Sequence, residues 1–456
     1  MHRHNLQFPV KEAALREDVH ALGSLVGEVL REQGGEALLK LVEDDRVAAI
    51  GRREGEPEGT ITLDMRATDR PAPQASELIR AFSKWFEVVN LAERVHRVRR
   101  RREYMNRSDR PQPGGIGDCM YRLKAAGFDG AQVLELLRDV TIYPVFTAHP
   151  TESTRRTMLR KQQQIADLMI ERLDPTLTPA ERRSVWERIR MEVTSSWQTE
   201  VHPRERLTVA DEREHVLFYL AEVIYRMVPA LYEELAYWLE TVFGVSADAG
   251  NLPLLLRFGT WVGGDMDGNT EVHAKSIRET LHRHQQRIIS TYYEECRILA
   301  GKLSQSASRV GVSRELEDRI AEYDILLPNS RQSTLSRHDR MPYRAFLSQV
   351  AARLRTTYDG HPNHYESAEH FIRDIEIVAT SLRANHGQYA GLFPVERLLC
   401  RARTFGFHLA TLDVRQHASV HRDVIRQGLA LADWKRRKVD ARRVVLREAL
   451  ARDRGP

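Results

Sequence analysis

The chain has 456 residues, with 69 Lys and Arg against 64 Asp and Glu, which gives a formal net charge of +5. Hydrophobic residues make up 42% of the chain and charged residues 29%, a composition that supports a large buried core and excludes wholesale disorder. The three cysteines, Cys119, Cys296 and Cys400, are far apart and odd in number, which excludes a disulfide scaffold and a Cys-X-X-Cys metal site.

The compartment is predicted from what the sequence lacks. No apolar run approaches the roughly 20 residues that a membrane-spanning helix needs. Residues 1–7 (MHRHNLQ) lack the apolar stretch of a secretory signal. Together with the unpaired cysteines, these features predict a cytoplasmic protein with no membrane association.

Most of the chain has the apolar spacing of amphipathic helices. Thr178 followed by Pro179 and by Glu181 predicts a capping box at the start of a helix. The apolar residues that follow recur every four positions and predict a buried stripe; they are Val185, Ile189, Val193 and Trp197. The next helix is expected to continue the pattern with Leu217, Leu220, Ile224 and Met227. Similar patterns predict helices over 75–103, 131–139, 276–308 and 366–390.

Three short stretches depart from the helical pattern and predict buried strands. They are residues 141–147, 254–261 and 407–414, rich in β-branched and aromatic residues. Long helical segments separate them, which favours parallel pairing. A polar cluster follows each strand, as at the carboxyl ends of strands in α/β barrels, where active sites lie. Three strands cannot close a barrel of eight, so unpaired strand edges are expected on both sides.

The first cluster contains His149. Pro150 keeps His149 extended and ends the strand, and Pro150 and Thr151 are expected to open the helix that carries Arg155 and Arg156. An imidazole beside a helix start and two guanidinium groups suits an anionic substrate. The alternative is a structural histidine that hydrogen-bonds at the end of a strand.

The second cluster, residues 261–269 (WVGGDMDGN), combines two carboxylates and an amide in a glycine-rich turn. A calcium-binding EF-hand loop is excluded, because the sixth and twelfth positions from Asp265 are Thr270 and Ser276 rather than Gly and Glu. The alternative to a functional role for Asp265 and Asp267 is a turn held by Asx hydrogen bonds.

The third cluster, residues 412–416 (LDVRQ), places Asp413 and Arg415 on one face of a strand. An arginine at a strand end suits bidentate binding of phosphate or carboxylate. The alternative is a local ion pair between the two side chains.

Two other patterns contain residue types that occur in binding sites. The basic run at 94–102 lacks an aromatic platform, so a solvated or substrate-facing helix end is favoured over a nucleic-acid interface, and no nucleic-acid partner is predicted. His417 and His421 are four residues apart, but no Glu or Cys completes a metal-ligand set. No metal site is predicted in this chain.

Together, the three clusters resemble the phosphoenolpyruvate carboxylase family. Residues 145–156 (VFTAHPTESTRR) are similar to its histidine signature throughout, and residues 258–269 (FGTWVGGDMDGN) to its tryptophan and Gly-Gly-Asp segment, with Met266 where Arg is common. Residues 412–416, with His421 following, match in order and rough spacing.

The resemblance implies a mainly helical protein with α/β-barrel elements, the amino-terminal half of a helix-rich, eight-stranded barrel with about three barrel strands present. It implies a lyase of anaplerotic carbon fixation that joins phosphoenolpyruvate and bicarbonate into oxaloacetate and phosphate, with Mg²⁺ or Mn²⁺ as cofactor. By motif match, His149 is the catalytic base and Trp261 lines the CO₂ pocket. Arg415, with Arg155 and Arg156, would bind substrate, supported by Asp265, Asp267 and Asp413.

Family members are about twice as long as this chain. Their second half, with the metal ligands and a catalytic Lys, has no counterpart here, so the chain is expected to be a fragment that is inactive alone. The complete enzyme is expected to be a homotetramer. Otherwise, this chain is expected to pair with a separate chain that supplies the complementary carboxy-terminal half. The alternative is an inactive helical remnant or scaffold. The predicted organisation is an amino-terminal helical region (1–140), the first barrel strands with long helical insertions (141–430) and an Arg-rich helical tail (431–456).

Overall fold

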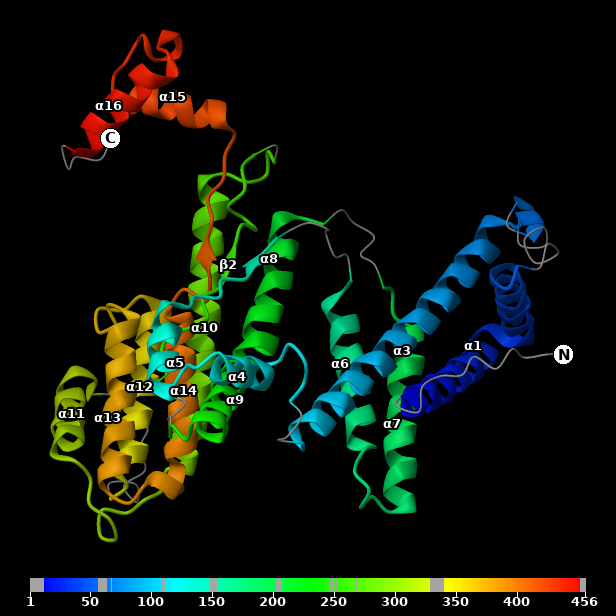
Figure 1. Ribbon diagram of the computed structural model, residues 1–456, viewed down its shortest axis with the longest axis horizontal. Coiled ribbons are helices and arrows are strands. Elements are labelled where there is room, and N and C mark those ends of the chain that lie inside the picture. Colours follow the sequence, from blue (N-terminus) through cyan, green and yellow to red (C-terminus); the bar gives the residue numbers. More distant parts are fainter. Residues whose placement is uncertain are drawn as a thin grey trace. The chain divides into compact units, whose positions relative to one another are not determined.

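The computed structural model describes residues 12–55, 64–66, 68–107, 111–147, 154–201, 207–246, 250, 252–267, 269–328 and 340–451. These residues are mainly helical and include one small parallel sheet, which confirms the predicted mainly α class (Figure 1). The chain divides into two compact units. The first contains residues 1–118 and 153–206, and the second contains residues 119–152 and 207–456.

Within the described residues, four long helices form most of the first unit. They are α1 (Ala13–Arg53), α3 (Ala72–Met105), α6 (Arg156–Glu171) and α7 (Pro179–Trp197). Helix α1 packs against α3 and α7, and α6 packs against the same two helices. The predicted capping box starts α7: the Thr178 hydroxyl accepts a hydrogen bond from the Glu181 N–H at 3.3 Å, and the Glu181 carboxylate accepts one from the Thr178 N–H at 2.8 Å. The stripe of four residues predicted on α7 is at most 5% exposed, so that prediction is confirmed.

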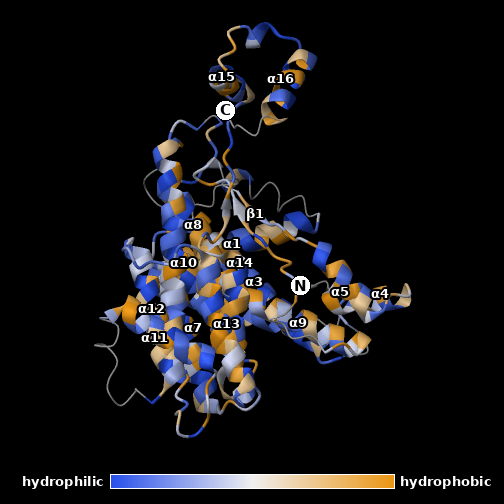
Figure 2. Cartoon of the chain, turned by 90° about the vertical axis from the view of Figure 1, so that its left-hand side faces the viewer, coloured by the Kyte–Doolittle hydropathy of each residue, from blue (hydrophilic) through white to orange (hydrophobic). Residues whose placement is uncertain are grey.

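The second unit carries the sheet and the remaining helices. Its helices are α4 (Ile116–Ala125, most of which belongs to this unit), α5 (Gly130–Asp139), α8 (Val209–Phe218), α9 (Tyr225–Phe243), α10 (Ala274–Lys302), α11 (Arg314–Leu326), α12 (Pro342–Asp359), α13 (Ala368–Ala384), α14 (Phe393–Phe405), α15 (Ala418–Gly428) and α16 (Val439–Ala451). Orange and blue residues alternate along the helices in Figure 2, as expected for amphipathic helices. Among the residues in the described ranges, every helix is too short or too polar to span a bilayer.

The stripe predicted around residues 217–227 is only partly correct. Leu217 and Leu220 are buried, but Met227 is 44% exposed. A π-helical segment, Tyr219–Ile224, joins α8 to α9. Its wider turn shifts the phase of the pattern, so Tyr225 and Val228 continue the buried face instead.

The sheet contains three two-residue strands, β1 (Val145–Phe146), β2 (Gly259–Thr260) and β3 (Thr411–Leu412). All pairs are parallel and the order is β1-β2-β3, with Val145 opposite Gly259 and Gly259 opposite Thr411. Each strand lies within a predicted one, so the predicted position and direction of the strands are confirmed. The predicted burial is confirmed for β2 but is wrong for β1 and β3, each of which has one exposed residue. Within the described residues, β1 and β3 each pair on one side only.

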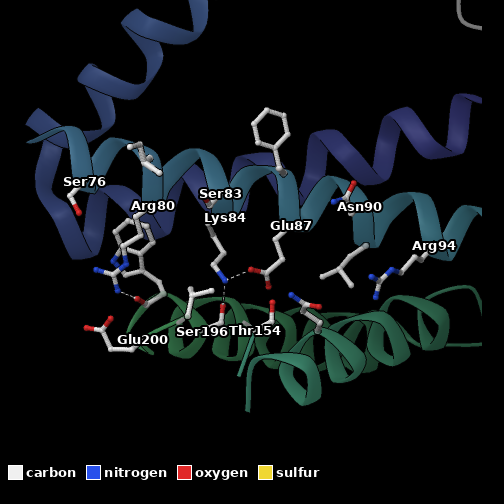
Figure 3. A pocket seen from close by; sticks show the side chains of 16 residues that line it. Ser76, Arg80, Ser83, Lys84, Glu87, Asn90, Arg94, Thr154, Ser196 and Glu200 are labelled. Atoms are coloured by element: carbon white, nitrogen blue, oxygen red, sulfur yellow. Dashed lines mark hydrogen bonds and ion pairs between the residues drawn. The ribbon is translucent and has the colours of Figure 1, made fainter. Parts of the chain in front are cut away.

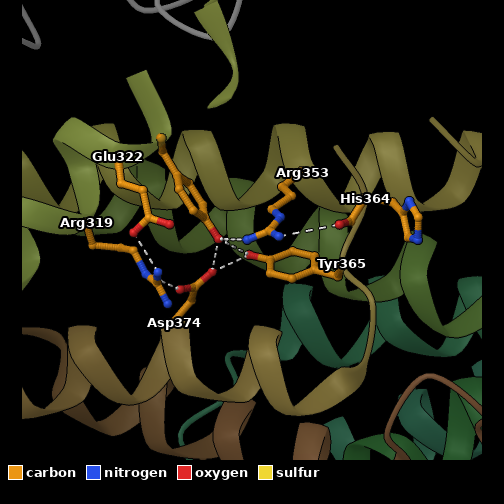
Figure 4. Close-up of polar contacts among 7 residues, drawn as sticks. Arg319, Glu322, Arg353, His364, Tyr365 and Asp374 are labelled. Atoms are coloured by element: carbon orange, nitrogen blue, oxygen red, sulfur yellow. Dashed lines mark hydrogen bonds and ion pairs between the residues drawn. The ribbon is translucent and has the colours of Figure 1, made fainter. Parts of the chain in front are cut away.

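A buried carboxylate, Asp374 of α13, joins three helices of the second unit (Figure 4). Its Oδ1 accepts a hydrogen bond from Arg319 Nε of α11 at 3.0 Å. Its Oδ2 accepts hydrogen bonds from the hydroxyls of Tyr365, at 2.6 Å, and Tyr323. Arg353 of α12 donates to the Tyr323 hydroxyl at 2.5 Å. Burial raises the pKa of Asp374, and the two tyrosine hydrogen bonds and the arginine charges oppose that rise.

The buried face of α10 contains a histidine, His284, that is 1% exposed. Burial lowers the pKa of His284 to about 4, and the nearby Arg213 charge acts in the same direction. Backbone hydrogen bonds at Ala410 and His408 oppose the shift. His284 is therefore neutral in the folded chain at neutral pH.

We expect His284 to make the stability of the chain depend on pH. Between pH 6.5 and pH 4 the unfolded histidine binds a proton that the folded one does not, so the free energy of unfolding falls as the pH falls through this window. A shift of this size corresponds to about 3 kcal/mol. Urea unfolding at pH 7 and pH 4.5 checks the prediction, because His284→Leu should remove this part of the dependence. The exposed His282 of the same helix provides the control, and His282→Leu should leave the dependence unchanged.

Candidate active site at the strand ends

The polar clusters that follow β2 and β3 lie at one edge of the sheet, because the two strands are parallel neighbours. Beyond β2 come Trp261, Asp265 and Asp267, and beyond β3 come Asp413 and Arg415. The cluster that follows β1 includes His149, which lies outside the described residues, as do Pro150 and Thr151. The structure therefore brings the second and third predicted clusters together.

Backbone hydrogen bonds continue the pairing beyond the strands. Asp413 N donates to Thr260 O at 2.8 Å, and Arg415 N donates to Gly264 O at 2.9 Å. Met266 N donates in turn to Arg415 O at 2.8 Å, and Asp265 and Arg415 form a parallel bridge. The turn after β2 is thus held against the segment after β3.

This pairing places the Arg415 side chain on Trp261. The guanidinium carbon of Arg415 lies 3.5 Å from the centroid of the indole ring. Trp261 is half-buried, and Arg415 is exposed. Within the described residues, the Arg415 guanidinium has no hydrogen bond or ion pair, so the alternative of a local ion pair with Asp413 does not hold in this part of the structure.

Two glycines allow the turn to fit between its neighbours. Gly263 has a φ of 81°, and a Cβ there would lie 2.4 Å from Thr280 Oγ1. A Cβ on Gly264 would lie 2.4 Å from the backbone oxygen of Asp413. Asp265 Oδ1 accepts a hydrogen bond from Asp267 N at 3.1 Å, so the Asx turn that is the alternative to a functional role is present. This hydrogen bond uses one oxygen of Asp265 and does not test a functional role. The functional role of Asp265 and Asp267 stays a prediction.

We expect Gly264→Ala to displace Asp413 and Arg415 from the turn. The clash is with backbone, which cannot move aside as a side chain can, so the chain should lose roughly 1–3 kcal/mol of stability. The matched control is Gly301→Ala near the end of α10, where an added Cβ meets nothing within 4 Å. Urea unfolding measures both variants. Equal stability of the two would contradict the close contact.

Arg155 and Arg156 belong to the first unit, at the start of α6. The helix begins at Arg156, with Arg155 as its extended N-cap residue, and not at Pro150 and Thr151 as predicted. The Arg155 side chain forms no capping hydrogen bond at this end. The Arg155 N–H instead donates to the carbonyl of Val201 at 3.3 Å, which favours an extended residue there.

The first unit also has a cavity of about 470 Å³ between α3, α6 and α7 (Figure 3). Lys84 is 4% exposed and donates to Glu87 Oε2 at 2.6 Å and to Ser196 Oγ at 3.0 Å. Burial lowers the pKa of Lys84, and the Glu87 charge opposes the shift. This cluster is not among the sites predicted from the sequence. A signal was available, because Lys84 shares a helical face with Ala81, Val88 and Leu91, which are all buried.

No group of three or more His, Cys, Asp and Glu side chains that could hold a metal ion occurs among the residues that the structure describes. Asp265, Asp267 and Asp413 do not form such a group. Among the described residues, no such group is therefore available to a divalent cation.

Comparison with known proteins confirms the resemblance. A family model described as phosphoenolpyruvate carboxylase matches residues 15–455. The phosphoenolpyruvate carboxylase of Xanthomonas euvesicatoria pv. vesicatoria (strain 85-10) is 45% identical over 446 residues, which cover 98% of this chain and 49% of the relative. Those of Ralstonia nicotianae, at 36% identity, and Azorhizobium caulinodans, at 32%, cover 92% and 98% of this chain and 44% and 49% of their own lengths.

The chain belongs to the phosphoenolpyruvate carboxylase family. It spans about half the length of the curated relatives that it matches.

Proposed function

We propose that this chain supplies the amino-terminal half of a phosphoenolpyruvate carboxylase, a carboxy-lyase that forms oxaloacetate and phosphate from phosphoenolpyruvate and bicarbonate. The observation that carries the proposal is the contact of Arg415 with Trp261 at the carboxyl ends of two parallel strands. The three strands are the first of an eight-stranded α/β barrel. The one-sided pairing of β1 and β3 within the described residues supports this, because each has an edge for a further strand.

The reaction starts when bicarbonate attacks the phosphorus of phosphoenolpyruvate. The P–O bond to the enol oxygen breaks, which gives carboxyphosphate and the enolate of pyruvate. His149 takes the carboxyphosphate proton, and the C–O bond to the phosphate then breaks and releases CO₂. The enolate carbon captures the CO₂ and forms oxaloacetate.

The proposed roles follow the charges that develop. Arg415 binds the phosphate through its planar fork of N–H donors, and Arg155 and Arg156 add cationic groups for the substrate. Trp261 lines the apolar pocket that keeps CO₂ from water. Asp413 is proposed to orient Arg415, and Asp265 and Asp267 are proposed as further supporting residues of the site.

The cofactor and the assembly belong to the complete enzyme. We assign the ligands of Mg²⁺ or Mn²⁺ to the carboxy-terminal half, because the described residues offer no fitting donor set. The complete enzyme is proposed to be a cytoplasmic homotetramer with an anaplerotic role. In this proposal, residues 1–140 form an amino-terminal helical region and residues 141–430 carry the first barrel strands with long helical insertions. Residues 431–456 form an Arg-rich helical tail.

The test uses a chimeric enzyme, in which residues 1–456 are followed by the carboxy-terminal half of the Xanthomonas euvesicatoria relative. With Mg²⁺, phosphoenolpyruvate and bicarbonate, the chimeric enzyme should form oxaloacetate, whereas residues 1–456 alone should not. A folded chimeric enzyme without activity, beside an active relative, would reject the proposal in favour of an inactive remnant. Normal turnover by residues 1–456 alone would reject the half-enzyme account.

A further inference from the structure

We propose that Trp261 is a positioning residue for Arg415, in addition to its proposed role at the CO₂ pocket. The inference rests on the proposed function. Its basis is the 3.5 Å distance between the Arg415 guanidinium carbon and the indole centroid. The other arginine–aromatic pairs among the described residues lie at 4.3–5.8 Å. This contact is thus the tightest of its kind there.

Within the described residues, stacking on the Trp261 ring is the main contact that restrains the Arg415 guanidinium. Arg415 is exposed and, within the described residues, forms no hydrogen bond or ion pair. Other arginines of the second unit are held by carboxylates, as Arg401 is by Glu295 at 2.7 Å. A free arginine side chain samples many rotamers, and ordering it upon binding weakens affinity.

Stacking restrains the guanidinium without using its donors. The indole covers one flat face, whereas the five N–H groups point outward in the plane of the guanidinium. The N–H edge remains available for a bidentate contact with a phosphate. An ion pair with a carboxylate would occupy the same donors and compete with the substrate, so an aromatic platform is the better restraint at a phosphate site.

The backbone fixes the platform as well as the arginine. Gly264 and Asp265 N–H groups donate to Trp261 O at 2.8 and 3.0 Å, which closes the turn that follows the tryptophan. The turn is joined to both sides of Arg415 through Gly264 and Met266. The backbone hydrogen bonds therefore hold Trp261 and Arg415 in a fixed position relative to each other. Only the two side chains must become ordered for the indole and the guanidinium to stack.

This role differs in its kinetics from that of a CO₂ pocket. Loss of the platform should raise the KM for phosphoenolpyruvate, because the phosphate-binding arginine is no longer held in place. Loss of an apolar CO₂ pocket should instead leave that KM unchanged and divert the enolate to pyruvate.

The experiment measures KM, kcat and the fraction of pyruvate in the chimeric enzyme for wild type, Trp261→Phe and Trp261→Leu. A weaker aromatic platform and then none should raise the KM for phosphoenolpyruvate in that order, by roughly 2- to 30-fold for Trp261→Leu. In an Arg415→Met background, Trp261→Leu should raise KM no further. Trp186→Leu is the matched control, because it removes the stack with Arg172 in the first unit and should leave KM unchanged.

The outcomes separate this inference from the proposed function. An unchanged KM in both Trp261 variants, with more pyruvate from Trp261→Leu, would overturn the positioning role and leave the proposed function standing. The same KM increase with and without Arg415 would also overturn it. A wild-type chimeric enzyme that forms no oxaloacetate would overturn both. If Trp261→Leu does not fold, an unchanged KM in Trp261→Phe would by itself overturn the positioning role.

Discussion

His149→Asn in the chimeric enzyme is expected to lower the rate of oxaloacetate formation by roughly 10²–10⁴-fold, the usual contribution of general acid–base catalysis. Asparagine approximates the shape of the imidazole but cannot take a proton. The KM for phosphoenolpyruvate should change little, because the phosphate is assigned to Arg415, and hydrolysis to pyruvate should persist.

Two coupled assays, one for oxaloacetate and one for pyruvate, measure this effect. His282→Asn, the same substitution at an exposed position of α10, is the control and should retain full activity. Carboxylation by His149→Asn at near wild-type rates would show that His149 is a structural residue.

The largest effect on stability is expected from Asp374→Ala. The substitution leaves Arg319 and two tyrosine hydroxyls without their shared acceptor in a buried site. Removing one partner of a buried ionic network typically costs about 3–5 kcal/mol. Urea unfolding of residues 1–456 provides the measurement.

Two variants complete that test. Asp440→Ala removes a carboxylate whose side chain is 92% exposed, and its ion pair with Arg443 should contribute at most about 1 kcal/mol. Tyr323→Phe removes one hydrogen bond to Asp374 and should cost less than Asp374→Ala. If Asp374→Ala lost no more stability than Asp440→Ala, the network would not be a stabilising centre of the second unit.

The sequence predicted the position and direction of the strands more reliably than their length. Residues 141–147, 254–261 and 407–414 were predicted as strands, and each contains a strand of two residues. Composition locates an extended segment, but the length of a strand depends on where a neighbour pairs with it. Neighbours lie far away in the sequence, so the pattern within one segment does not contain that information.

Helices were predictable where local chemistry determines them. The capping box at Thr178 and the stripe on α7 depend on residues within a few positions of one another, and both are confirmed. The π-helical segment Tyr219–Ile224 was not predicted, because its apolar spacing is compatible with an ordinary helix. That segment caused the misplaced prediction at Met227.

Buried charges were missed although the sequence contained a signal. Asp374 shares a helical face with Phe371 and Val378, which are both fully buried. A charged residue in a core position predicts a paired, buried group. The contact of Arg415 with Trp261 was beyond sequence reasoning, because it depends on the register between strands that are separated by about 150 residues of chain.

The origin of one oxygen atom tests the central claim most directly. If bicarbonate attacks the phosphorus, phosphate formed by the chimeric enzyme from ¹⁸O-labelled bicarbonate must contain one labelled oxygen, measured by mass spectrometry before the label exchanges with water. We predict one ¹⁸O in each phosphate, formed together with an equal amount of oxaloacetate. Unlabelled phosphate, or phosphate formed without oxaloacetate, would contradict the assignment of this chain to a phosphoenolpyruvate carboxylase active site.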